Sequence, residues 1–74
     1  MLSVFNSKHL RWEDDNTTSV DYFEFFMDDA TDLPSTQDYY IGVEKYKIAQ
    51  GSLAYDISTG DMYMLKSDGT WVLQ

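Results

Sequence analysis

The sequence predicts a mainly all-β fold: a small antiparallel sheet that ends in a three-stranded C-terminal meander, with little or no helix. Two observations predict this class. Residues 51–74 contain three short runs rich in Tyr, Met, Leu, Ile, Val and Trp, which suit half-buried strands. Residues 20–27 (VDYFEFFM) have the aromatic and β-branched density of a further strand. The chain, residues 1–74, is expected to form one small domain.

The two loops of the meander, 58–60 (STG) and 67–69 (SDG), each end in glycine. The last residue of a three-residue hairpin loop adopts a positive φ, where a Cβ clashes with the backbone. We therefore expect Gly60 and Gly69 to be structural turn residues in the left-handed region.

Three-residue loops also decide which side chains share a face of the meander. They pair Tyr55 with Tyr63 in the first hairpin, and Leu65 with Trp71 in the second. Two-residue loops at the same glycines are chemically plausible, but they would slip the register and divide the apolar residues between both faces. The expected shared face then consists of Leu53, Tyr55, Ile57, Tyr63, Leu65, Trp71 and Leu73. The predicted core residues are Trp71, Tyr55 and Leu65.

The N-terminal residues 1–12 are expected to form an edge strand, or an arm that reaches a neighbouring subunit, with a break at Asn6 and Ser7. Residues 13–19 (EDDNTTS) indicate a solvated loop, because Asp, Asn, Thr and Ser cluster there. Their three consecutive acids lack the spaced oxygen ligands and the glycine of a calcium loop.

Residues 28–36 (DDATDLPST) are the longest irregular stretch. A single helical turn capped by Asp28 or Asp29 fits here and must end before Pro34, because proline disfavours helix at the preceding residue. Residues 45–49 are then expected to form a strand that leads into the meander.

The composition limits how so small a domain is stabilised. A chain of 74 residues buries only roughly 60% of its unfolded surface, so its stability is expected to be marginal without support. With no Cys and one His, disulfides are excluded, and neither a metal site nor a cofactor is expected. Oligomerisation or docking on a larger assembly remains available.

The net charge of −8 disfavours nucleic acid and anionic membrane surfaces as partners. The charge is concentrated in residues 12–44, where ten acids occur without a single Lys or Arg. No signal peptide and no apolar run long enough to span a membrane are visible.

No motif of nucleophilic, phosphate-binding or metal-dependent catalysis is present, and no catalytic residue is predicted. His9 is the one side chain whose ordinary pKa lies near 7, and it is expected to be an ordinary surface residue. We therefore expect a non-enzymatic protein.

Apolar residues on both faces of two segments suggest a protein interface. Phe23 and Phe25 alternate with Tyr22 and Phe26, and the second face of the meander also contains methionine. So many apolar side chains cannot all face water, so residues 1–27 or a partner must cover them. The residues expected at a protein interface are Met62, Met64, Val72, Tyr22, Phe26 and Phe5.

Residues 30–74 resemble short proteins and terminal modules encoded among the structural genes of tailed bacteriophages. The pattern is a DLP turn, then G-S-x-A-Y-D-x-x-T-G, a Tyr-containing strand and G-x-W. Its residues here are Asp32, Leu33, Pro34, Gly51, Ser52, Ala54, Tyr55, Asp56, Thr59, Gly60, Tyr63, Gly69 and Trp71. The resemblance implies a virion-associated structural role and carries over no binding residues.

These observations lead to one main hypothesis and two alternatives. The main hypothesis is a structural component of a bacteriophage particle, such as a capsid decoration or a head- or tail-attached protein. It would reside in the virion, and in the host cytoplasm during assembly, and dock on viral structural proteins or on itself. The alternatives are an acidic inhibitor that mimics nucleic acid, and a carbohydrate-binding module for host attachment.

Overall fold

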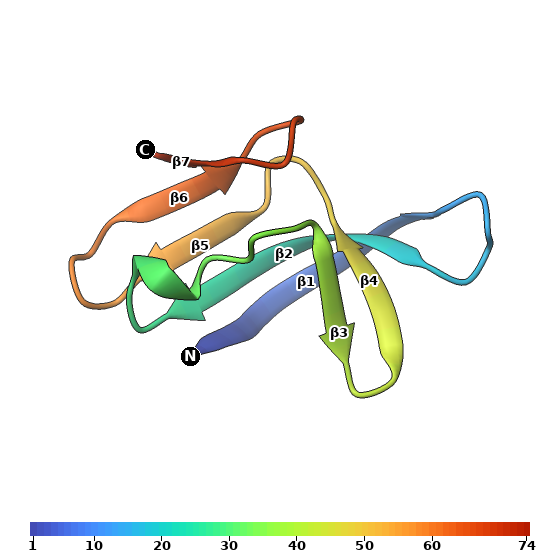
Figure 1. Ribbon diagram of the computed structural model, residues 1–74, viewed down its shortest axis with the longest axis horizontal. Helices are drawn as coiled ribbons and strands as arrows, with labels where there is room; N and C mark the ends of the chain where they lie inside the picture. Colours follow the sequence, from blue (N-terminus) through green and yellow to red (C-terminus); the bar gives the residue numbers. More distant parts are fainter.

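The computed structural model describes residues 1–74 as seven strands and one short 3-10 helix. Along the chain these are β1 (Leu2–Trp12), β2 (Ser19–Met27), η1 (Ala30–Asp32), β3 (Asp38–Ile41), β4 (Glu44–Ile48), β5 (Leu53–Asp56), β6 (Met62–Leu65) and β7 (Trp71–Leu73). The β3–β4 hairpin and the β5–β7 meander both pair with β2, and their strands point in different directions (Figure 1). The all-β class and the C-terminal three-stranded meander are thus confirmed.

The sheet is mixed, with strand order β3-β4-β2-β5-β6-β7 and β1 on the other edge of β2. β2 pairs in parallel with both β4 and β5, while the remaining pairs are antiparallel. The prediction of an antiparallel sheet is wrong for these two pairings. Parallel strands are joined by long crossover connections, so no tight-turn signal marks them in the sequence.

β4 and β5 share one edge of β2, and the chain turns between them at residues 49–52. At this break the backbone N–H of Phe23 has no strand partner and donates instead to Ser52 Oγ at 3.0 Å. Ser52 is fully buried. Because a buried N–H without an acceptor is costly, this hydroxyl completes the hydrogen bonding of β2 where two strands meet beside it.

The hydrophobic core lies on one face of β2 and the meander, which we call the core face. Its buried members are Phe23, Phe25, Met27, Ile48, Ala54 and Leu65. The β3–β4 hairpin packs over them: Tyr39 meets Phe23 and Phe25 edge-on, with ring centroids 5.4 and 5.2 Å apart. The predicted core position of Leu65 is confirmed, since only 2% of it is exposed.

The irregular segment between β2 and β3 covers the rest of the core face. Leu33 packs on the core, and Trp71 Nε1 donates to the carbonyl of Pro34 at 3.2 Å. Trp71 is half-buried and packs edge-on against Phe25. The single helical turn expected here is confirmed as η1, which Asp29 caps.

The two hairpins of the meander differ in their agreement with the predicted register. The β6–β7 pairing of Leu65 with Trp71 across a three-residue loop is confirmed. The β5–β6 prediction is wrong: Tyr55 pairs with Met62, and Tyr63 with Ala54. Tyr55 therefore points away from the core, which corrects its assignment as a core residue.

The first loop of the meander spans four residues, 57–60, rather than three. Its geometry is fixed by Asp56 Oδ1, which accepts hydrogen bonds from the backbone N–H of Ser58 (2.9 Å) and from its hydroxyl (2.6 Å). Gly60 (φ 78°) and Gly69 (φ 88°) both lie in the left-handed region, as predicted. The glycines were identified correctly, but the loop before Gly60 is one residue longer.

β1 is a continuous edge strand of 11 residues rather than two short pieces. Its pairing with β2 shifts between Val4 and Asn6 and again between His9 and Arg11. The expected break at Asn6 is therefore a local bulge, in which the strand bends but pairing continues.

Candidate docking surface

The face of the sheet opposite the core face carries a continuous set of apolar side chains. Residues paired in register share a face, so the pairs Phe26–Tyr55, Tyr55–Met62 and Met64–Val72 extend this set from β2 to β7. We call this surface the outer face; its apolar members are Phe5, Tyr22, Phe26, Leu53, Tyr55, Met62, Met64 and Val72. It brings together all six residues that the sequence analysis expected at an interface.

One end of the outer face is aromatic. Phe5 stacks on Phe26 with ring centroids 4.3 Å apart, and Phe26 meets Tyr55 edge-on at 6.1 Å. Phe5 has no partner residue in β2, because it is the extra residue at the first shift of register in β1. The bulge thus places an exposed aromatic ring over the sheet, with 52% of Phe5 accessible to solvent.

Glu24 is an acid on this face, and its hydrogen bonds are satisfied locally. Its carboxylate accepts from the hydroxyl of Tyr22 at 2.6 Å and from Asn6 Nδ2 at 2.9 Å. These two bonds lower the pKa of Glu24. Burial, together with the bond to Glu24, raises the pKa of Tyr22 to about 12. The pair is therefore a neutral phenol bonded to a carboxylate at ordinary pH.

The other end of the outer face is aliphatic and hollowed. Met64 and Val72 line a hollow of about 400 Å³ beside Lys66, and about two-fifths of each remains exposed. Residues 1–27 do not cover it, because β1 lies beside β2 at the edge of the sheet. The apolar surface anticipated on the meander is therefore left open by the chain itself.

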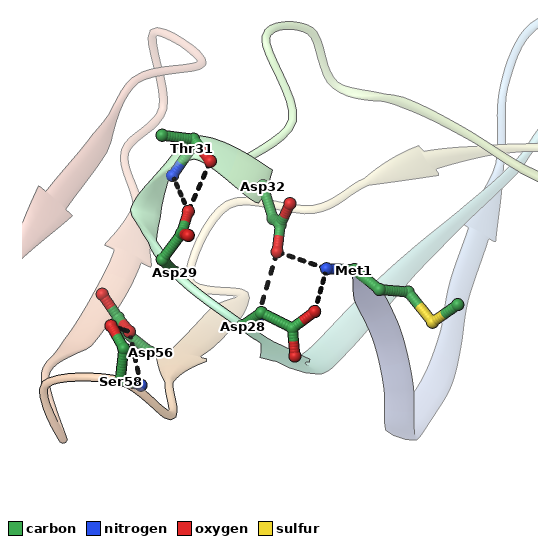
Figure 2. Close-up of polar contacts among 7 residues, drawn as sticks. All are labelled: Met1, Asp28, Asp29, Thr31, Asp32, Asp56 and Ser58. Carbon is green, nitrogen blue, oxygen red and sulfur yellow. Dashed lines mark hydrogen bonds and ion pairs between the residues drawn. The ribbon is translucent and has the colours of Figure 1, made fainter.

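Several acids have structural roles in turns. Asp15, Asp29, Asp56 and Asp68 each accept hydrogen bonds from a Ser or Thr two residues later. Figure 2 shows two of these turns, at Asp29 and Asp56. The backbone N–H groups of Thr17 and Thr18 lower the pKa of Asp15 to about 2. Part of the negative charge thus stabilises loops.

The start of β1 is attached to the segment after β2. The α-amino group of Met1 lies 2.5 Å from both Asp28 Oδ2 and Asp32 Oδ2 (Figure 2). The bond to Asp28, followed by that to Asp32, raises the pKa of this amino group. The same contact lowers the pKa of Asp32.

A second polar cluster, which the sequence analysis missed, joins β1 to β2. His9 Nδ1 lies 2.5 Å from Ser19 Oγ and 3.4 Å from Asp21 Oδ1, and the Ser19 hydroxyl donates to Asp21. The signal that would have found it is the antiparallel pairing of the two strands, which sets His9 opposite Asp21.

This cluster contains the residue types of a hydrolase triad in a different arrangement. In such a triad the two ring nitrogens of the histidine face the serine and the acid separately, and the serine proton passes to the histidine. Here one nitrogen of His9 faces both partners, while Ser19 donates to Asp21. The geometry supports a link between two strands rather than a nucleophile with its base.

No group of three or more His, Asp or Glu side chains is arranged to hold a metal ion. The structure has no helix with the length and apolar character needed to cross a membrane. No family model, curated protein or solved structure matches this chain.

Proposed function

We propose that this protein is a non-enzymatic structural component of a bacteriophage particle. It acts by docking its outer face on other virion proteins or on further copies of itself. Its place of action is the virion, and the host cytoplasm while particles assemble.

The observation that carries the docking role is the open, apolar outer face. Contiguous apolar surface of this kind marks interaction sites in soluble proteins, because monomers rarely leave such patches in water. Aromatic and methionine side chains such as Phe5, Phe26 and Met64 are also the types enriched at interface centres.

The assignment to a phage particle is supported by the resemblance of residues 30–74. Several residues of that pattern have structural roles in this fold. Pro34 accepts from the indole of Trp71, Ala54 lies in the core, and Asp56 fixes the first loop of the meander. The residues of the pattern therefore stabilise the fold, which is consistent with a structural module.

The two alternatives depend on other features. An acidic inhibitor would present the ten acids of residues 12–44 to a basic partner, and Asp15 and Asp29 among them also have a structural role in turns. A carbohydrate-binding module would stack sugars on exposed aromatic rings; Trp12 and Tyr40 are exposed, whereas Tyr39 and Tyr46 are half-buried and each packs edge-on against Phe23. Neither alternative gains a specific supporting observation.

Two experiments test the proposal at different levels. Mass spectrometry of purified particles from the phage that encodes the chain should detect the protein in a fixed copy number. Val72→Glu should then abolish its incorporation into particles, because it places a charge on the apolar outer face. Val43→Glu is the matched control, since Val43 is 95% exposed in the turn between β3 and β4.

Absence of the protein from particles would contradict the virion assignment. Equal incorporation of both variants would contradict docking through the outer face. Circular dichroism of the two purified variants separates a docking defect from a folding defect.

A further inference from the structure

Two hollows adjoin on the outer-face side of the molecule and share Gln50 and Ser67. The first, of about 400 Å³, lies at Met64, Val72 and Lys66. The second, of about 320 Å³, is lined by Leu10, Arg11, Val20, Gln37, Lys47, Ile48, Ala49, Gln50 and Ser67. Together they form a groove that leads from the β1–β2–β4 region to the end of the meander.

The charge of this groove is opposite to that of the whole protein. The chain has 13 acids, yet no Asp or Glu lines either hollow. Three of its five Lys and Arg residues do: Arg11, Lys47 and Lys66. The groove itself thus has no acid in its lining, while Lys47 also borders a neighbouring hollow lined by Glu13, Asp14, Asp15 and Asp38.

The ion pairs that these cations already make leave them able to accept another carboxylate. Glu13 is shared by Arg11 Nη1 at 3.4 Å and Lys47 Nζ at 3.2 Å, so one carboxylate faces two positive charges. Lys66 Nζ lies 3.8 Å from Asp68, and both side chains are more than half exposed. Exposed pairs of this kind are weak, so an incoming acid competes with them readily.

We infer that this groove binds an acidic polypeptide segment of another protein. Carboxylates of that segment face Arg11, Lys47 and Lys66, and one apolar side chain of it packs against Met64 and Val72. The inference rests on the proposed function, because it names the partner chemistry of the same docking surface.

Charge and polarity favour this occupant over two others. A second copy of the chain would bring its whole charge of −8 against the acids outside the groove, whereas a short segment places its carboxylates only at the cations of the groove. A nucleic acid has phosphates at every step, whereas the Met64–Val72 end offers apolar surface and no cation beyond Lys66. An acidic segment with one apolar anchor fits both ends of the groove.

The test is fluorescence anisotropy of the purified 74-residue protein with labelled probes in low salt. The probe is a ten-residue peptide of Glu and Asp with a single Phe, synthesised with the Phe near either end. The comparison probes are its Phe→Ser form, its Glu→Lys form and an oligodeoxythymidine of equal charge. We expect the acidic Phe peptide to bind. Its Phe→Ser form should bind at least tenfold more weakly, and its Glu→Lys form should not bind.

Variants then locate the binding site. Lys47→Glu and Lys66→Glu should each weaken the acidic Phe peptide about tenfold or more, and added salt should do the same. Lys8→Glu is the matched control: it makes the same charge change on β1, outside both hollows, and should leave affinity unchanged.

Four results would overturn the inference. These are failure of the acidic Phe peptide to bind, equal loss with Lys8→Glu, equal or tighter binding of oligodeoxythymidine, and self-association that Lys47→Glu abolishes. If the peptide fails while Val72→Glu still prevents incorporation into particles, docking through the outer face stands and only the acidic partner is wrong.

Discussion

The two faces of β2 have nearly the same chemistry in the sequence and opposite positions in the fold. Phe23, Phe25 and Met27 are fully buried. Tyr22 and Phe26 alternate with them; Tyr22 is half-buried and Phe26 is 39% exposed. The difference is made by residues far along the chain, because Leu33, Tyr39 and Trp71 pack on one face only. Apolar side chains therefore indicate that a face must pack against something. They do not indicate whether another segment of the chain or a partner protein packs there.

The largest expected effect separates the two faces directly. Phe25→Ala should lower the free energy of unfolding by about 3–5 kcal/mol, the usual cost of removing a buried large aromatic. Phe26→Ala should cost only about 1 kcal/mol, the scale of an aromatic pair, since Phe26 stacks on Phe5 at the surface. Urea denaturation of both variants measures the difference. Similar losses would mean that the outer face is also core.

The next effect concerns the break between β4 and β5. Ser52→Ala removes the acceptor of the Phe23 N–H and should cost about 1–3 kcal/mol, because a buried donor is left unpaired. Ser67→Ala, in an exposed loop, is the control and should change stability by less than about 0.5 kcal/mol. Amide hydrogen exchange at Phe23 should also accelerate in the Ser52 variant. Unchanged exchange would contradict the role given to this hydroxyl.

The sequence predicted those features that depend on local chemistry. Gly60 and Gly69 were identified from their turns, and the second hairpin was correct because its three-residue loop brings Leu65 opposite Trp71. The first hairpin was wrong because aromatic residues fit either face, so Tyr55 and Tyr63 gave no unique register. The register of this hairpin is set by Asp56, whose carboxylate accepts hydrogen bonds from Ser58. The pattern of apolar residues carries no information about these bonds.

The candidate site was predicted in part. Six of the eight apolar residues of the outer face were expected at an interface, whereas the wrong register of the first hairpin placed Leu53 and Tyr55 on the opposite face. The groove was not foreseen, because it depends on the parallel pairing of β2 with β4, which places Lys47 and Arg11 on either side of Val20. Such long-range parallel contacts leave no local signature in the chain.

A smaller effect is expected at the two glycines of the meander. Gly60→Ala and Gly69→Ala should each cost about 1 kcal/mol, since both adopt positive φ. The added Cβ would make only ordinary contacts, with Gln37 at 3.4 Å from position 69 and with the hydroxyl of Tyr55 at 3.7 Å from position 60, so the two costs should be similar. Thermal denaturation measures both, and no loss of stability in either variant would contradict the requirement for positive φ.

The smallest effect comes from the carboxylates of the turns, such as Asp15 in the loop between β1 and β2. The pKa of Asp15 falls from 3.8 to about 2, so this group stabilises the fold above pH 4. That contribution is lost as the pH falls through about 4 towards 2. The bonds to Ser58 and Thr70 likewise lower the pKa of Asp56 and Asp68.

Asp15→Asn keeps an acceptor for Thr17 but removes the titration, so its melting temperature should fall less steeply in acid than that of the parent protein. Asp14→Asn makes the same charge change beside it, and it should follow the parent curve. If the melting temperatures of both variants fall equally with decreasing pH, the Asp15 turn does not contribute to the loss of stability in acid.

The shared edge of β2 also sets the order in which the chain can assemble. Three units can form from neighbouring residues alone: the β1–β2 hairpin, the β3–β4 hairpin and the β5–β7 meander. Their strands join one sheet through parallel pairing to β2, with partners 27 positions apart for β4 and 29 positions apart for β5. Long-range parallel pairing of this kind is slow, because the entropy of closing the loop is lost before the new contacts stabilise the chain. We therefore expect the barrier to refolding to be the docking of two finished hairpin units on the third.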